Sequence, residues 1–253
     1  MDLTNKVILI TGACGLIARE LVQTLSLKNA NLILVDSDKD KLDALQKNLN
    51  CSRTFCFPTN LLDFDSHAKI LDFTKSSFEK LDCVIHLAYP KTSSWGTPFG
   101  KLSQNHLLED LNGQLALPIL FSQNVLKFFE EQNSGNLIHV SSIQGIAAPK
   151  FEHYEGTEMV SPIEYTAVKA ALIAITKYLA KLSKNKNIRV NCISPGGVLA
   201  GQPNSFIQKY KSSCVNKGML DPRDLIGAFL FLISDESQFI TGQNIIVDDG
   251  WSL

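Results

Sequence analysis

The chain has 253 residues and a formal net charge of -1, with 24 lysines and arginines against 25 aspartates and glutamates. This length suits one α/β domain. The balanced charge gives no indication of a basic surface that would bind nucleic acid or an anionic membrane. The six cysteines lack metal or disulfide spacing and no apolar run approaches the roughly 18 residues of a membrane span, so we expect a cytoplasmic protein that binds a small molecule.

Apolar runs and helical patterns alternate along the chain. Because the apolar runs are continuous, they predict parallel strands covered on both faces, and hence a doubly wound α/β sheet of the Rossmann type with six or seven strands. We expect a single domain over residues 1–253, with ligands beyond the carboxyl ends of the strands. The main predicted strands are 6–12, 31–36, 83–88, 136–142, 188–196 and 243–249, and the predicted helices are 16–28, 38–49, 104–132, 162–184 and 221–234.

The first predicted strand leads into a turn with small residues at Gly12, Gly15 and Ala18. Such a turn lets backbone approach a pyrophosphate at a helix N-terminus, which predicts a dinucleotide site. Asp36 ends the next strand, where a carboxylate accepts from the ribose hydroxyls of NAD and repels the 2'-phosphate of NADP, unless it only caps the following helix. The predicted cofactor contacts at this end are Gly12, Cys14, Gly15, Leu16, Ile17, Asp36, Asn60, Leu61 and Ala88, of which Asn60 could equally be a turn residue.

Two tyrosines compete for a catalytic role. Tyr165 is followed four residues later by Lys169 in an unbroken helical pattern, whereas Tyr154 is followed by Glu158 in a segment that resembles a loop. An ammonium one turn away favours the phenolate, so we expect Lys169 to lower the pKa of Tyr165 and make it the acid/base. Ser142 ends the strand NLIHVSS and is expected to bind the reacting oxygen. His86 has the pattern of a satisfied core histidine.

The motifs TGACGLIA, VIHLAYP, LNGQL, VSSIQG, YTAVK and NCISPGG make the chain resemble the compact short-chain dehydrogenase/reductase family over almost its whole length. The resemblance implies that Tyr165 is the general acid/base, that Ser142 orients the substrate, and that Lys169 also holds the nicotinamide ribose. It further implies that Asn112 supports a water relay behind Lys169, and that the protein is a homodimer or homotetramer. Three further residues would line the nicotinamide, namely Pro195, Gly196 and Val198.

Three segments are expected to form substrate loops, at about 89–104, 144–163 and 198–220. The second is longer than is usual in the family, and together with VDDGWSL it resembles the subgroup associated with bacterial flagellin-glycan and surface-sugar synthesis. Its polar groups would overhang the site or pack on a neighbouring subunit. Side chains that could line the pocket or bind an anion, or merely pack or be solvated, are Trp95, Phe99, Lys209, Lys211 and Lys217.

These features predict an NAD-dependent oxidoreductase that interconverts a secondary alcohol and a ketone on a sugar or sugar-derived acid. Two alternatives stay open. The first is a redox-neutral epimerase or dehydratase of a nucleotide-linked sugar. The second is a non-catalytic dinucleotide-binding accessory subunit, although Ser142, Tyr165 and Lys169 are all present.

Overall fold

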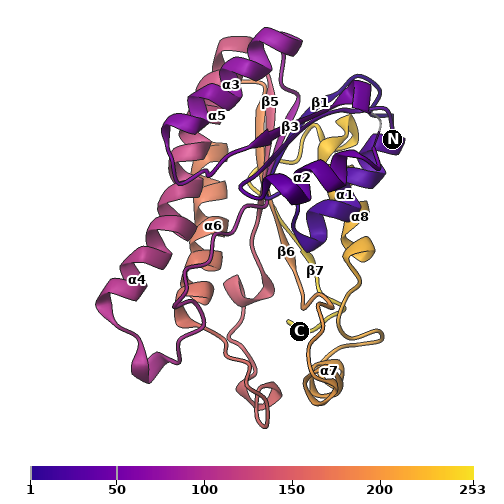
Figure 1. The fold of residues 1–253 in the computed structure, drawn as a ribbon. Helices are drawn as coiled ribbons and strands as arrows, with labels where there is room; N and C mark the ends of the chain where they lie inside the picture. Colours follow the sequence, from indigo (N-terminus) through magenta and orange to yellow (C-terminus); the bar gives the residue numbers. More distant parts are fainter. Residues whose placement is uncertain (1, 50) are drawn as a thin grey trace.

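The apolar strands form one parallel sheet at the centre of the molecule (Figure 1). The computed structural model describes residues 2–49 and 51–253, and within them the sheet has seven strands in the order β3-β2-β1-β4-β5-β6-β7. The order reverses between β1 and β4, which creates the crevice in which doubly wound sheets bind ligands. The strands are β1 (Val7–Thr11), β2 (Asn31–Asp36), β3 (Thr54–Pro58), β4 (Cys83–His86), β5 (Gly135–Val140), β6 (Ile188–Pro195) and β7 (Asn244–Val247).

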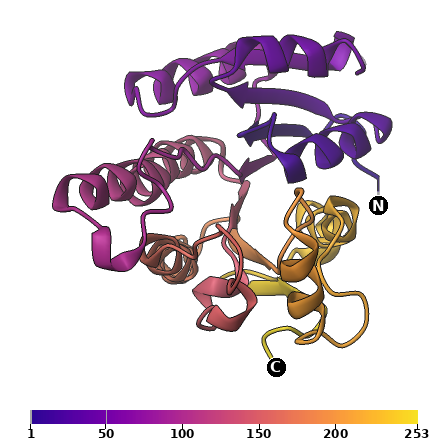
Figure 2. The same ribbon diagram turned by 60° about the horizontal axis from the view of Figure 1, so that its bottom comes forward.

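Successive strand residues face opposite sides of this sheet, and helices cover both sides (Figures 1 and 2). Ile8 and Ile10 pack with the helices α1, α2 and α8, whereas Val7 and Leu9 pack with α3 and α5. Because each strand is buried on both faces, its sequence is apolar throughout, which confirms the predicted fold class. The helices are α1 (Leu16–Leu27), α2 (Lys39–Gln46), α3 (Asp65–Phe78), α4 (Gln104–Leu111), α5 (Leu117–Gln132), α6 (Ile163–Leu182), α7 (Asn204–Lys211) and α8 (Ile226–Ile233).

The helix predicted over 104–132 is not one continuous α-helix. A π-helical turn, Asn112–Ala116, separates α4 from α5. Such turns insert an extra residue and rotate the faces on either side relative to a regular helix. Two helices, α3 and α7, were absent from the predicted set. Helix α7 lies inside the segment at about 198–220, which was expected to form a substrate loop.

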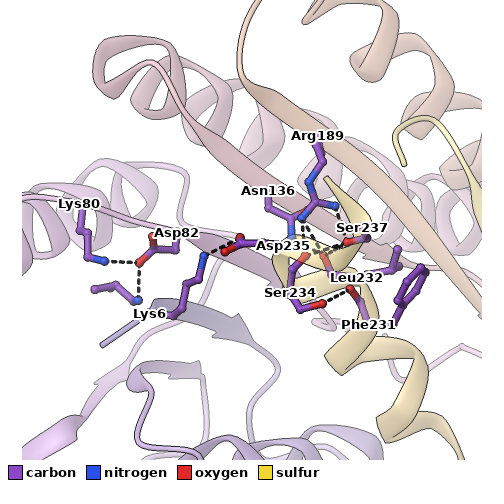
Figure 3. A network of polar contacts seen from close by, with 11 residues as sticks. Lys6, Lys80, Asp82, Asn136, Arg189, Phe231, Leu232, Ser234, Asp235 and Ser237 are labelled. Atoms are coloured by element: carbon purple, nitrogen blue, oxygen red, sulfur yellow. Dashed lines mark hydrogen bonds and ion pairs between the residues drawn. The ribbon is translucent and has the colours of Figure 1, made fainter. Parts of the chain in front are cut away.

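The amino ends of the strands are joined by polar contacts at the edge opposite the predicted site (Figure 3). Arg189 donates to the carbonyl oxygens of Leu232 and Ser234 at 3.0 and 3.4 Å, and so satisfies the carboxyl end of α8. Asn136 donates to the same Leu232 oxygen at 2.7 Å, and Lys6 pairs with Asp235 at 2.9 Å. These contacts fix β1, β5 and β6 to α8, while the carboxyl ends of the strands remain lined by loops.

No helix within residues 2–49 and 51–253 is long and apolar enough to cross a bilayer. The same residues contain no group of three or more His, Cys, Asp or Glu side chains placed to hold a metal ion. Free thiols in the described part of the chain include Cys14, Cys83, Cys192 and Cys214, and the side chain of Cys51 lies outside that part.

Candidate active site

A cavity of about 500 Å³ opens at the carboxyl ends of the strands. All three segments expected to be substrate loops contribute to its walls, and Figure 2 shows these segments from the side on which they lie. Its floor contains Ser142, Tyr165 and Lys169, so residues 27 positions apart in the chain meet in one place. Other lining residues are Tyr89, Lys91, Trp95, Gln144, His153, Tyr154, Val198, Phe206, Tyr210 and Trp251.

The two serines after β5 have different partners, as strand alternation predicts. Ser141 is buried and its Oγ donates to the carbonyl oxygen of Lys169 at 2.6 Å, which ties α6 to the strand end. Ser142 has extended backbone, and its Oγ accepts from the N–H of Gln144 at 3.2 Å. The Ser142 hydroxyl also lies on the side of the Tyr165 phenol and acts to lower the pKa of that phenol. The phenol and the hydroxyl can therefore share one substrate oxygen.

Lys169 lies in the floor with its ammonium toward the aromatic rings. Its Nζ donates to the carbonyl oxygen of Val140 at 2.9 Å, and it lies 5.5 Å from the centroid of the Tyr165 ring. The ring of Tyr89 is nearer, with its centroid 4.6 Å from Nζ. Burial disfavours the charged amine and lowers the pKa of Lys169 to about 8. The i, i+4 spacing thus brings the amine beside the phenol ring, as the helical pattern predicted.

The expectation that Lys169 lowers the pKa of Tyr165 is not met by this arrangement. Burial of the phenol is the largest influence and raises the pKa of Tyr165, while the Ser142 hydroxyl opposes it. Burial dominates because the ammonium lies over the ring faces of Tyr165 and Tyr89, donates to a backbone oxygen, and is itself desolvated.

Asn112 does not reach the cavity. Its side chain is exposed and is not among those that line the cavity, and its role in a water relay behind Lys169 stays a prediction. Gln114 in the same turn is buried, lines the cavity, and accepts from the Tyr89 hydroxyl at 2.7 Å. Within this turn, the side-chain amide that lines the cavity is that of Gln114, two residues further along the chain.

A second cleft adjoins the first and contains most of the residues expected at the dinucleotide. Gly12 has a φ of +64°, and a Cβ there would lie 2.9 Å from the Ala88 backbone, so only glycine fits the turn. Helix α1 begins behind Gly15 with no side-chain cap and no acidic residue in its first turn, which leaves its N–H groups available to an anion. The predicted residues that line this cleft are Gly12, Gly15, Leu16, Asp36, Asn60, Leu61 and Ala88.

Asp36 lies at the mouth of this cleft and is not the cap of α2. Its Oδ2 accepts from the N–H of Cys14 at 2.9 Å and its Oδ1 from that of Asp38 at 3.1 Å. The N-cap of α2 is Asp38, whose carboxylate accepts from the N–H of Lys41. Asn60 fits both of its predicted roles: it lines the cleft, as a cofactor contact would, and its side chain accepts from the N–H of Leu62 in a turn.

The remaining predicted cofactor residues lie beside the first cavity. Ile17, Pro195, Gly196 and Val198 all line it, so the glycine turn and the end of β6 flank one continuous space. Cys14 contributes its backbone N–H to Asp36 and does not line either cleft with its side chain.

The structure distinguishes between the alternatives left open for several side chains. Phe99 is 78% exposed and forms no wall, whereas Trp95 does line the cavity. Lys209 donates to the backbone oxygens of Glu152 and Glu155, and Lys217 pairs with Asp224, so these lysines are engaged outside the cavity. Lys211 is exposed, as are Glu152, Glu155 and Glu158 of the long loop.

His86 is only half satisfied. Its Nδ1 lies 2.9 Å from the Thr11 hydroxyl, whereas its Nε2 is buried without a hydrogen-bond partner among the described residues. Burial holds the pKa of His86 well below its ordinary value, so the ring is neutral. The ring also lines the cavity. The interpretation of His86 as a satisfied core histidine therefore holds for Nδ1, which has a partner, and not for Nε2.

Sequence patterns did not identify Tyr89, which is central to the site. Its ring meets the Tyr165 ring edge to face with centroids 5.5 Å apart and also carries the Lys169 ammonium. The available signal was its position directly after the strand end VIHLA, where a large aromatic side chain must lie over the crevice.

A family model described as enoyl-(acyl carrier protein) reductase matches residues 12–252. The chain belongs to the short-chain dehydrogenase/reductase family. Members share this fold, and the protein is accordingly an oxidoreductase of the dehydrogenase/reductase class. This confirms the resemblance that the motifs indicated.

The relatives of this short-chain dehydrogenase/reductase extend over its whole length. The post-translational flagellin modification protein A of Campylobacter coli is 40% identical over 255 residues, which cover 99% of this chain and 100% of that protein. The 7alpha-hydroxysteroid dehydrogenase of Bacteroides fragilis is 27% identical over 256 residues, covering 98% and 95% of the two chains. A short-chain dehydrogenase from Leptospira borgpetersenii, solved with bound NAD+, has a TM-score of 0.88 and 29% identity, covering 100% of this chain and 94% of that one.

Proposed function

We propose that this protein is an NAD-dependent oxidoreductase that interconverts a secondary alcohol and a ketone on a sugar or sugar-derived substrate. The observation that carries the proposal is the convergence of Ser142, Tyr165 and Lys169 in the floor of a cavity that adjoins the glycine turn. The substrate class draws support from the 40% identity to a flagellin modification protein and from the likeness to the surface-sugar subgroup. Cytoplasmic location and a role in carbohydrate metabolism belong to the same proposal.

The residues that line the second cleft are chemically suited to binding NAD. The uncapped start of α1 suits a pyrophosphate, and the Asp36 carboxylate suits a ribose diol. Related structures were solved with NAD+ and, for a 4-hydroxyisoleucine dehydrogenase at 26% identity and a TM-score of 0.80, with NADH. Residues that would hold the nicotinamide half are Pro195, Gly196, Val198, Tyr165 and Lys169.

When bound, the nicotinamide supplies or accepts the hydride. The chain's own residues then move the proton: Tyr165 gives a proton to the substrate oxygen in reduction and removes it in oxidation. Ser142 hydrogen-bonds the same oxygen and fixes its position. The Lys169 ammonium lies over the Tyr165 ring and is held there by its hydrogen bond to the carbonyl oxygen of Val140, and the side chains of Ser142 and Lys169 are buried.

Net turnover of the nicotinamide tests this function. Purified protein is incubated with NAD or NADP and with panels of free, phosphorylated and nucleotide-linked sugars, and absorbance of the reduced cofactor is followed. We expect stoichiometric reduction of NAD by one class, and its loss in Tyr165→Phe. The matched control is Tyr178→Phe, because Tyr178 lies on the same helix and is 68% exposed. Product formation without net change in nicotinamide would instead favour the epimerase or dehydratase alternative.

The Tyr165→Phe variant also tests the accessory-subunit alternative. If it binds NAD and retains full biological activity, the protein acts without turnover and the catalytic proposal is wrong.

Cofactor preference gives an independent test of Asp36. We expect NAD to be used in preference to NADP, and Asp36→Ala to narrow the difference, because the carboxylate near the ribose repels a 2'-phosphate. Asp40→Ala is the control, since Asp40 is exposed in the first turn of α2. Equal use of both cofactors by the unmodified protein would exclude this role for Asp36.

We also infer that the protein assembles as a homodimer or homotetramer. Apolar side chains are exposed along α4, α5 and α6, which lie on one side of the sheet (Figure 1). Light scattering of the purified protein tests the inference, with a monomer as the contrary result. The exposed side chains are Leu108, Ile119, Leu120, Ile163, Tyr178 and Leu182.

A further inference from the structure

The charge in the substrate cavity is unbalanced. Its lining, taken from the described part of the chain, includes the lysines Lys91 and Lys169 and no aspartate or glutamate. This contrasts with the whole sequence, in which acidic and basic residues nearly cancel. The ammonium of Lys169 already has partners in the floor of the cavity, because it donates to the Val140 oxygen and lies over two tyrosine rings. Lys91 is therefore the cation that the cavity offers to a ligand.

Lys91 lies at the rim and contacts an aromatic face instead of a carboxylate. Its Nζ is 3.9 Å from the centroid of the Trp95 ring, and among residues 2–49 and 51–253 it forms no salt bridge. The residue as a whole is exposed, and desolvation of part of its side chain lowers the pKa of Lys91 from its ordinary value. A cation in this setting has given up part of its hydration without gaining an anionic partner, so binding an anion is favourable there.

The wall that carries Lys91 is built by a chain of hydrogen bonds. Trp95 Nε1 donates to the Tyr89 hydroxyl at 3.1 Å, and that hydroxyl donates to Gln114 at 2.7 Å. Gln114 in turn donates to the carbonyl oxygen of Pro90 at 3.0 Å, directly before Lys91. The indole under the ammonium and the backbone beside it are both anchored to the buried Gln114. Hydrogen bonds within the fold therefore hold both the backbone beside Lys91 and the Trp95 ring that its ammonium contacts.

We propose that Lys91 is the anion-binding residue of the substrate cavity, and that the substrate carries a carboxylate or phosphate group recognised by its ammonium over the Trp95 ring. This inference rests on the proposed function, whose substrate class it narrows to anionic sugars or sugar acids. The lysines of segment 198–220 do not take this role, because Lys209 and Lys217 are bound elsewhere and Lys211 does not line the cavity. Lys91 also borders the dinucleotide cleft, so the pyrophosphate of the cofactor is the other source of the same chemistry.

Calorimetric titration of the NAD-saturated protein with matched ligands tests the proposal. The probes are glucose 6-phosphate and glucuronate as anionic sugars, glucose as the neutral sugar, and inorganic phosphate alone. We expect each anionic sugar to bind at least about tenfold more tightly than glucose, which corresponds to about 1.4 kcal/mol. Lys91→Gln should remove this difference, and Lys91→Arg should retain most of it because the charge is kept. Lys211→Gln, at an exposed position outside the cavity, should leave it unchanged.

A separate titration with NAD alone distinguishes the two sources of anion. If Lys91→Gln binds NAD as tightly as the unmodified protein, the anion is that of the substrate. If Lys91→Gln instead loses affinity for NAD and still binds the anionic sugars more tightly than glucose, Lys91 binds the pyrophosphate of the cofactor and the proposal is wrong. Equal binding of charged and neutral sugars, or no binding of any anionic probe, overturns it as well. Failure of the proposed function differs from these results, since it appears as absent NAD binding or absent hydride transfer.

Discussion

Replacement of Tyr89 should change the ionisation of Lys169 without touching either the amine or the catalytic phenol. The Tyr89 ring centroid lies 4.6 Å from the Lys169 ammonium, nearer than the 5.5 Å to the Tyr165 centroid. A desolvated cation–π contact is worth about 2 kcal/mol, and one pKa unit corresponds to about 1.4 kcal/mol. Part of the loss is recovered by other contacts, so in Tyr89→Leu we expect the pKa of Lys169 to fall by about one unit from its value of about 8.

The sign of this shift determines the change in activity. A lower pKa means that Lys169 loses its proton at a lower pH, and with it the positive charge that lies over the Tyr165 ring. For alcohol oxidation, the alkaline limb of the pH profile of kcat/KM should move down by about one unit, since this limb reports loss of the Lys169 proton in the free enzyme.

Proton titration by NMR of protein labelled at lysine Cε measures the same quantity without substrate, with the signal assigned from Lys169→Met. Tyr89→Phe is the matched variant, because it keeps the ring and loses only the hydroxyl that contacts Gln114 and Trp95. It should lower the melting temperature slightly and leave the pKa of Lys169 in place. Equal pKa values of Lys169 in Tyr89→Leu and in the unmodified protein would refute the reasoning.

Two further predictions concern stability. Gly12→Ala should destabilise the fold by about 2 kcal/mol or more, because its φ is +64° and a Cβ would meet the Ala88 backbone. In α8, a Cβ at Gly227 would meet nothing within 4 Å, so Gly227→Ala should stabilise the fold by about 0.5–1 kcal/mol. Thermal melts compare the two variants, and equal effects would contradict the steric argument. Burial lowers the pKa of His139 to about 4, below its unfolded value near 6.5, so the stability that it contributes is complete above pH 6.5 and is lost as the pH falls toward 4, by about 3 kcal/mol. His139→Gln should flatten denaturant-derived stability over this range, and an unchanged slope would exclude His139 as the cause.

The parts of the fold and site that the sequence predicts are those set by local periodicity. Continuous apolar runs predict the sheet because both faces are covered, and the glycine at position 12 marks a turn that no other residue can adopt. The spacing of Tyr165 and Lys169 places both on one side of a helix because α6 is regular there. These inferences depend on a few neighbouring residues, and tertiary packing does not alter them.

The parts that the sequence did not predict depend on distant packing. The π-helical turn that begins at Asn112 interrupts the regular helix predicted over 104–132, and within it Asn112 is exposed whereas Gln114 is buried. Helix α7 has little local signal, and it forms because Phe206 and Tyr210 pack with Trp251, more than 40 residues away in the sequence. The pKa of Tyr165 could not be predicted from its spacing to Lys169, since burial of the phenol is a property of the assembled cavity.

The long loop and α7 form one wall of the cavity and therefore act together on the substrate. His153 Nε2 lies 3.0 Å from the Ser213 hydroxyl, and Lys209 bridges to the loop backbone at 2.9 and 3.0 Å. The hydroxyl of Tyr210 accepts from the N–H of Gly197 at 2.6 Å, which joins this wall to the end of β6. Because the acidic residues of the loop are exposed and Tyr154 lines the cavity together with Phe206 and Tyr210 of α7, the wall can bind the apolar face of a substrate. Charge selection is then left to the opposite wall, where Lys91 lies over Trp95.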